Sequence, residues 1–211
     1  MRRVANLLRE LRDDNRGLAF IEFAFAGPIF VLLVIGGLEI ANLAMAHLRV
    51  SQIAMTVADN AGRVTSGIDE ANVREVFAGA DLIGEPLDFA ANGRIVLSSL
   101  EENGKNGNRR GQVIGWQRCF GDLAVDPAYG EQGDGENDNS LRAGMGKDGN
   151  RITAGSNTAL MFVEVTYVYQ PLIATGFFDP PTIRYESAFN VRGRQNNAIS
   201  NTQNLTVAAC D

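Results

Sequence analysis

The sequence predicts an α+β fold in which one long N-terminal helix packs on a small antiparallel sheet. Three observations support this prediction: the mainly apolar segment Leu18–Ala46, an apolar stripe with helical spacing that continues to Val64, and later segments with the two-residue alternation of strands. The chain has 211 residues, enough for one domain and an anchor, and 45% of them are hydrophobic, which is enough for a core.

Charge is distributed unevenly along the chain. The formal net charge is −6, but the first seventeen residues carry five Arg and three acids, so the remainder carries −8. An acidic body argues against binding of nucleic acid, because neutralising phosphates requires clustered Lys and Arg. His47 is the only histidine in the sequence, which excludes metal sites built from several histidines.

The apolar segment favours a membrane-spanning helix. Phe23–Leu38 contains no charged residue, and the apolar character extends over Leu18–Ala46, beyond the roughly 20 residues that a spanning helix needs. A secretory signal peptide would have a shorter apolar run, and a buried core helix would be apolar on one side only. Because five arginines within residues 1–17 directly precede the segment, the positive-inside rule predicts a cytoplasmic N-terminus and an extracytoplasmic remainder.

Two cysteines lie in the part of the chain that is predicted to face an oxidising compartment. We expect Cys119 and Cys210 to form a disulfide, because an even number of cysteines in such a compartment usually pairs. Two buried free thiols are the alternative.

The carboxylate of Glu22 lies within the apolar segment, where such a group costs roughly 3 kcal/mol and usually has a function. Gly17 followed by four residues and then Glu22 resembles the processing site of type IV prepilins, in which a membrane peptidase cuts after the Gly. With Phe23 next to the Glu, Pro28 six residues beyond it and Glu39 at the far end, the segment resembles the TadE-like pseudopilins of tight-adherence (Flp, type IVc) pilus systems.

This resemblance covers about residues 15–45 and implies a pilin-like fold with cleavage after Gly17. Leu18 would then be the first mature residue, and its new amine would neutralise Glu22 of its own chain or of a neighbouring subunit. The alternative is that Glu22 extends to water at the level of the lipid headgroups. Pro28 would kink or loosen the helix, as accompanies filament packing in pilins, unless it is simply tolerated in the membrane.

The head is predicted from its residue patterns alone. We expect a short helix from Asp69 to about Asp81, with an apolar face formed by Val73, Val76, Phe77 and Ala80. Strands are expected at Ile95–Leu100, Val113–Arg118, Met161–Tyr169 and Ile183–Val191, with a further edge strand near Leu205–Ala209.

The chain is therefore predicted to have three parts. These are a cytoplasmic basic leader that is cleaved (1–17), an N-terminal helix that spans the membrane to about residue 46 (18–64), and an extracytoplasmic head (65–211).

A long loop, 121–150, interrupts the predicted strands. It contains seven Gly and seven acidic residues, so we expect it to be exposed and to bury little. Asp134, Glu136 and Asp138 place oxygen atoms at alternate positions and are weak candidates for calcium ligands, but they do not match the EF-hand pattern. A solvated loop is the favoured interpretation.

No catalytic arrangement is found in the sequence, so we expect neither an enzyme nor a cofactor. A Ser/His/Asp triad would require His47 at the membrane edge, and 144–148 lacks the spacing of a phosphate-binding loop. Asp138 and Ser140 match only part of the metal site of von Willebrand-type domains. A tethered hydrolase therefore has no candidate residues.

The favoured function is that of a minor pseudopilin for assembly of a tight-adherence pilus, which serves adhesion, biofilm formation and surface attachment. Its expected partners are a prepilin peptidase, other pilin or pseudopilin subunits, the pilus assembly platform and the membrane. Its expected location is the bacterial inner membrane, crossed once, with a periplasmic head or with incorporation into a surface pilus. The alternative is an uncleaved, membrane-anchored binding module that binds calcium.

Overall fold

The computed structural model describes residues 17–173, 179–194 and 196–210. The chain divides into two compact units, of which the first ends at Leu43 and the second begins at Ala44. Of the predicted basic leader, 1–17, only Gly17 lies within the described residues.

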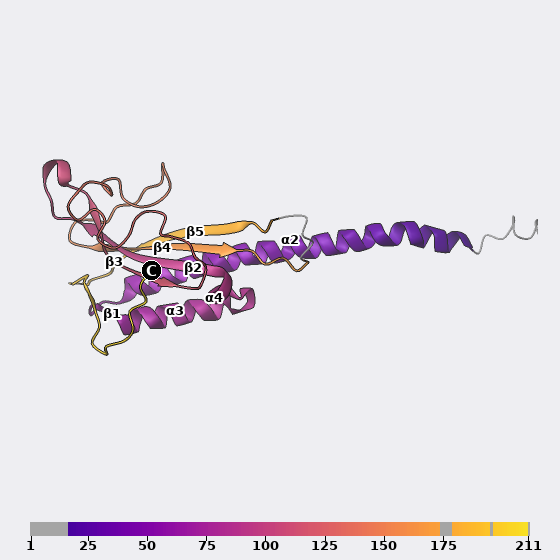
Figure 1. The fold of residues 1–211 in the computed structure, drawn as a ribbon, viewed down its shortest axis with the longest axis horizontal. Coiled ribbons are helices and arrows are strands. Elements are labelled where there is room, and N and C mark those ends of the chain that lie inside the picture. Colours follow the sequence, from indigo (N-terminus) through magenta and orange to yellow (C-terminus); the bar gives the residue numbers. More distant parts are fainter. Residues whose placement is uncertain (1–16, 174–178, 195, 211) are drawn as a thin grey trace, which may run out of the picture. The chain divides into compact units, whose positions relative to one another are not determined.

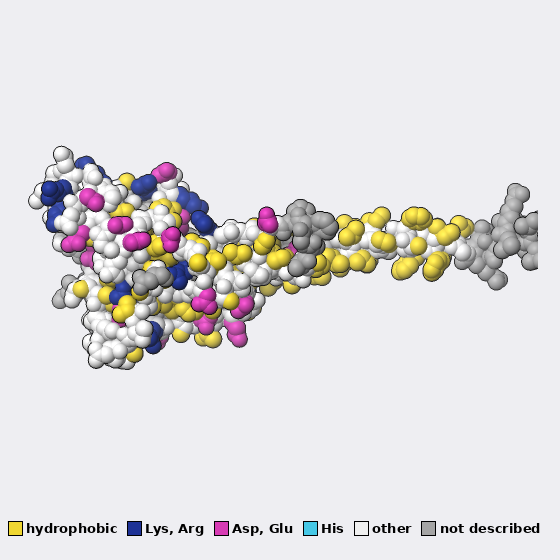
Figure 2. Space-filling model, viewed as in Figure 1, with side chains coloured by type: hydrophobic (Ala, Val, Ile, Leu, Met, Phe, Trp, Pro, Cys, Tyr) yellow, Lys and Arg dark blue, Asp and Glu magenta, His cyan; other side chains and the backbone are white. Residues whose placement is uncertain are grey.

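The first unit consists of the N-terminal part of helix α2 (Leu18–Arg63), which contains Pro28 without interruption. This part of α2 exposes large apolar side chains along its length, as Figure 2 shows for one face. Phe20, Phe23, Phe25, Phe30, Leu32 and Leu33 are each more than 65% exposed. Among the described residues, none of its most apolar 18-residue window is buried. The single long helix confirms the predicted one.

The second unit is built on a four-stranded antiparallel sheet with strand order β3-β2-β4-β5 (Figure 1). The strands are β2 (Gly93–Glu102), β3 (Gln112–Phe120), β4 (Ala159–Val168) and β5 (Thr182–Asn190), and the short helix η3 (Gly107–Arg109) lies between the first two. All four predicted strands are confirmed, with bounds that shift by one or two residues. A bulge between Ser99 and Leu100 shifts the register of β2 against β3.

Two helices cover one face of this sheet. The C-terminal half of α2 buries Val50, Ile53, Ala54, Val57 and Ala61 of the predicted stripe, together with Ala46, Ala58 and Gly62. Val64, the last residue of the predicted stripe, follows the end of the helix and is half-buried. Helix α3 (Glu70–Gly84) starts at a capping box and stacks Phe77 on Phe120 of β3, with ring centroids 5.7 Å apart. The short helices η2 (Glu85–Leu87) and α4 (Phe89–Asn92) lead into β2, and Phe89 stacks on Tyr167 of β4.

The long connection between β3 and β4 covers the opposite face. Leu141, Met145 and Ala154 from this connection form a buried cluster with sheet residues that include Leu100 and Phe162. The expectation that 121–150 buries little is therefore wrong for its second half, since Met145 is fully buried. The few apolar residues of the loop are held in place by turns, and an isolated antiparallel bridge joins Met145 to Ile152.

The C-terminal segment contacts two elements of the head, β1 and β3. Strand β6 (Ile199–Ser200) pairs in parallel with β1 (Ile68–Asp69), just before α3. The edge strand predicted near Leu205–Ala209 is wrong, because this stretch forms no strand and a single backbone bond, from the Cys119 amide to the Ala208 carbonyl at 2.8 Å, joins it to β3. One such bond is too little for a ladder.

A buried arginine satisfies the C-terminal end of α2. Arg194 is 6% exposed and donates from Nε to the carbonyl of Val64 at 2.9 Å and from Nη2 to that of Ala61 at 2.7 Å. The backbone amide of Arg192 donates to the carbonyl of Gly62 at 3.1 Å. These bonds pair carbonyl groups that a helix end leaves without partners, and the positive charge complements the helix dipole.

Arg194→Met should lower the free energy of unfolding of the head by about 2–3 kcal/mol, because two buried charge-assisted hydrogen bonds are lost. Chemical denaturation of the full chain in detergent measures this loss. The matched control is Arg192→Met, whose side chain is 64% exposed and whose capping bond comes from the backbone, so it should change stability by less than about 0.5 kcal/mol. Equal losses in the two variants would contradict the capping role.

Candidate processing and assembly site

The first residue of the candidate site is Gly17, which immediately precedes the start of α2 at Leu18. Gly17 is exposed, and a Cβ atom built on it would meet no atom of the described residues within 4 Å. Its backbone also lies outside the left-handed region that favours glycine. The described part of the chain therefore does not require glycine at this position.

Leu18 and Glu22 are neighbours on the surface of α2. They are four residues apart, which places their side chains about 6 Å apart on the same helical face. Both are exposed, and no ion pair of Glu22 is found within the part of the chain that the structure describes. A positive charge at residue 18 would thus lie one helical turn from a carboxylate.

The surroundings of this pair are strongly apolar. Phe23 follows the carboxylate directly, and it is 73% exposed. An 18-residue stretch of α2 has a mean hydropathy of 2.5, and none of it is buried in the protein. Helix α2 is thus long and apolar enough to serve as a membrane anchor.

Pro28 is a weak point in the hydrogen bonding of α2. Proline has no amide hydrogen, so the carbonyl of Ala24 lacks its usual helical donor although the helix continues. Gly36 and Gly37 lie further along, where an added Cβ would meet nothing within 4 Å. The helix can loosen at these positions at lower cost than elsewhere.

In the head, Cys119 of β3 and Cys210 are joined by a disulfide, with their Cα atoms 4.9 Å apart. This pairing is the predicted one. The bridge spans a sequence separation of 91 residues, so it should stabilise the head by about 4 kcal/mol in the chain-entropy description.

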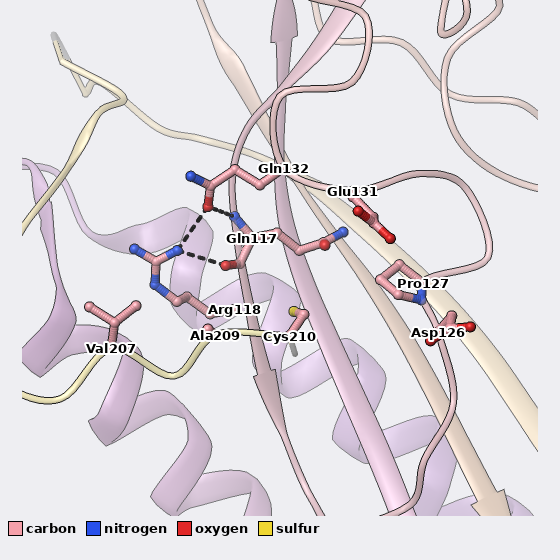
Figure 3. A pocket seen from close by; sticks show the side chains of 9 residues that line it. All are labelled: Gln117, Arg118, Asp126, Pro127, Glu131, Gln132, Val207, Ala209 and Cys210. Atoms are coloured by element: carbon pink, nitrogen blue, oxygen red, sulfur yellow. Dashed lines mark hydrogen bonds between the residues drawn. The ribbon is translucent and has the colours of Figure 1, made fainter.

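A cavity of about 560 Å³ adjoins the disulfide at the outer edge of β3 (Figure 3). Arg118 forms a buried ion pair with Glu70 of α3, and its Nη1 donates to the carbonyl of Gln117 and to Gln132. Gln132 in turn accepts from the amide of Gln117 at 3.1 Å. Arg118 and Gln132 thus provide hydrogen-bond partners for the backbone carbonyl and amide of Gln117 at the edge of β3. The ion pair between Arg118 and Glu70 holds α3 to the sheet. The sequence gives no local signal for this pair, because Glu70 and Arg118 are 48 residues apart.

Two of the three candidate calcium ligands act as hydrogen-bond acceptors within their own loop. Asp134 accepts from the amide of Glu131 at 2.9 Å, and Asp138 accepts from that of Ser140 at 2.8 Å. Glu136 is exposed. Among the described residues, no group of three or more His, Cys, Asp or Glu is arranged to hold a metal ion.

A long apolar helix whose C-terminal half packs on a small antiparallel sheet is a pilin-like arrangement of an α+β protein. Residues 17–59 match the family model of the TadE-like proteins, which begins at Gly17 and includes Glu22, Phe23 and Pro28. The predicted resemblance is thereby confirmed for this segment, and it connects the chain with Tad pilus systems. Neither the curated proteins nor the solved structures gave a match to the chain.

Removal of the disulfide should change both migration and stability. The oxidised chain should migrate faster in denaturing electrophoresis than the reduced chain, because the bridge keeps the denatured chain compact. Cys119→Ser and Cys210→Ser, two matched variants, should each migrate like the reduced chain and lose about 2–5 kcal/mol of stability. Labelling of both thiols in the native protein without reductant would contradict the pairing.

Proposed function

We propose that this chain is a minor pseudopilin that a prepilin peptidase cleaves after Gly17 and that takes part in assembly of a Tad pilus. The match of residues 17–59 to the TadE-like family supports the pilus connection. The observation that carries the processing step is the position of Gly17, exposed at the start of α2 where the fold does not require glycine. Glu22 follows one helical turn beyond Leu18.

Cleavage requires that the backbone around residue 17 lies extended in a narrow active site. Glycine suits this position, because it has no side chain to obstruct the approach of the peptidase. Water adds across the peptide bond between Gly17 and Leu18, which leaves a carboxylate on the leader and a new amine on Leu18. The basic leader is thereby removed and α2 becomes the N-terminus of the mature protein.

The new amine gives Glu22 a partner at membrane depth. An unpaired carboxylate in an apolar environment is costly, and an ammonium group one turn away on the same helix, or on a neighbouring subunit, offsets much of that cost. A pairing between subunits would also fix the axial offset of adjacent helices. The exposed apolar residues of α2 then supply the contact surface for other pilin subunits, and the break in hydrogen bonding at Pro28 lets the helix adjust during packing.

The proposed location is the bacterial inner membrane, with the leader in the cytoplasm and the head in the periplasm. The arginines before α2 support this orientation through the positive-inside rule. The Cys119–Cys210 disulfide supports it independently, because disulfides form and persist in oxidising compartments such as the periplasm.

Gly17→Arg should block maturation in a host that carries the cognate peptidase, because a long side chain obstructs the scissile position. The product should keep its leader and be about seventeen residues longer, as intact mass and N-terminal sequencing would show. Gly17→Ala is the matched control, since its small side chain should leave partial or full cleavage. An intact Met1 on the wild-type protein, or normal pili from a Gly17→Arg strain, would refute processing and favour the uncleaved, membrane-anchored alternative.

Glu22→Ala should be cleaved and yet impair pilus assembly, because the new amine loses its partner. Counting surface pili and quantifying the mature chain in the same strain separates the two steps. Glu75→Ala, which removes an exposed carboxylate from α3 in the head, should leave both steps unchanged. Normal piliation of the Glu22→Ala strain would contradict the proposed pairing.

A further inference from the structure

Two glutamates face each other on the sheet face that the long connection covers. Glu164 of β4 and Glu186 of β5 are register partners. The amide of Val191 donates to the carbonyl of Ala159, which makes these two residues a hydrogen-bonded pair of the ladder. Hydrogen-bonded and non-hydrogen-bonded pairs alternate along an antiparallel ladder, so Glu164 and Glu186 form a non-hydrogen-bonded pair. Side chains in such pairs are the closest across an antiparallel sheet, with Cβ atoms about 5 Å apart, and like charges there repel.

Glu164 is only partly satisfied by hydrogen bonds. Its side chain is nine-tenths buried, and its Oε2 accepts from the backbone amide of Ala128 at 2.9 Å. Its Oε1 is buried without a hydrogen-bond partner among the described residues. A buried carboxylate with an unsatisfied oxygen beside a second carboxylate is costly as an anion and much less costly as a neutral acid.

The second glutamate holds the residue after Ala128. The hydroxyl of Tyr129 donates to Glu186 at 2.6 Å, and its ring packs edge-on against Phe162 with centroids 5.6 Å apart. Two adjacent residues of the connection are therefore attached to the sheet by two adjacent carboxylates.

Other charged groups surround the pair. A cavity of about 110 Å³ beside it is lined by Arg94 of β2, by Arg184 of β5, and by Asp126 and Lys147 of the connection. Arg151 also acts electrostatically on Tyr129.

Burial raises the pKa of Glu164 to about 7. The hydrogen bond from the Ala128 amide and the positive charge of Arg184 lower the pKa of Glu164, whereas the negative charge of Glu186 raises it further. Burial and the bond to Glu186 raise the pKa of Tyr129, so its hydroxyl remains a donor in this range.

We propose that Glu164 and Glu186 form a pH-sensitive latch for the segment Asp126–Tyr129: Glu164 is protonated while the segment is docked on the sheet, and its ionisation releases the segment. Once the segment opens, water reaches Glu164 and its pKa returns to its ordinary value near 4.5. The docked state therefore binds the proton more tightly than the open state. Docking is most stable below about pH 4.5 and weakens as the pH rises to about 7. Above about pH 7 its stability no longer changes with the ionisation of Glu164.

Release of this segment would change a second part of the surface. Asp126 and Pro127 also line the cavity at the edge of β3, as Figure 3 shows. Opening of the latch thus widens that cavity and uncovers Phe162. The latch lies in the head and is independent of processing at Gly17.

Hydrogen exchange at the Ala128 amide tests the latch in the full chain in detergent micelles. After correction for intrinsic rates, protection of this amide should fall about thirtyfold between about pH 5.5 and about pH 8.5. Glu164→Gln, a neutral side chain of the same shape, should keep its protection across this range. Glu136→Gln removes an exposed acid of the same connection and should behave like the wild type. Constant protection in the wild type, or an unchanged pH dependence in Glu164→Gln, would overturn the proposal.

A second measurement needs no substitution and covers the case in which Glu164→Gln fails to fold. The side-chain carboxyl ¹³C signal of Glu164 in the wild-type chain reports its titration directly. A midpoint near pH 7 that coincides with the loss of Ala128 protection supports the latch. A midpoint below about pH 5 would overturn it.

Discussion

The packing of residues 46–62 of α2 against the sheet is the interaction on which the rest of the head depends. Val50, Ile53 and Val57 are fully buried there, and each contributes roughly 1.5–3 kcal/mol relative to an exposed side chain. This burial fixes where the helix ends, and so places the carbonyls of Ala61 and Val64 next to Arg194. With one face of the sheet occupied by helices, the connection between β3 and β4 has to cover the other. The same helix also carries the exposed apolar residues of the first unit. One continuous helix therefore has a C-terminal half that is buried in the head and an N-terminal part whose apolar side chains are exposed.

The elements that could be predicted from the sequence are those whose signals are local. The stripe of α2, the apolar face of α3 and the alternation in four strands each depend on spacing within a short window, and all are found in the structure. The candidate processing site was visible for the same reason, because Gly17, Glu22 and Pro28 lie within twelve consecutive residues. The match of residues 17–59 to a family model covers the same stretch.

The features that could not be predicted depend on pairing between distant segments. Glu70 and Arg118 are 48 residues apart in sequence, and only the docking of α3 on the sheet brings them together. Glu164 and Glu186 become neighbours through strand register, which alternation within one strand does not define. The buried Met145 lies in a stretch rich in Gly and acids, where average composition conceals a single residue with a specific position. In each case the residue has its structural role through contact with residues that are distant in the sequence.

The disulfide also sets the mechanical behaviour of the head. It links β3 to Cys210, so that β4, β5 and the long connection between β3 and β4 lie inside one covalent loop. A force applied between α2 and the backbone at Cys210 is transmitted across the sulfur–sulfur bond and cannot stretch the residues within that loop. About 91 residues, or roughly 320 Å of fully extended chain, are thereby withheld from extension. Under tension the head can lengthen only through the residues that precede Cys119, which makes α2 and α3 the compliant part of the molecule and the β4–β5 half the inextensible part.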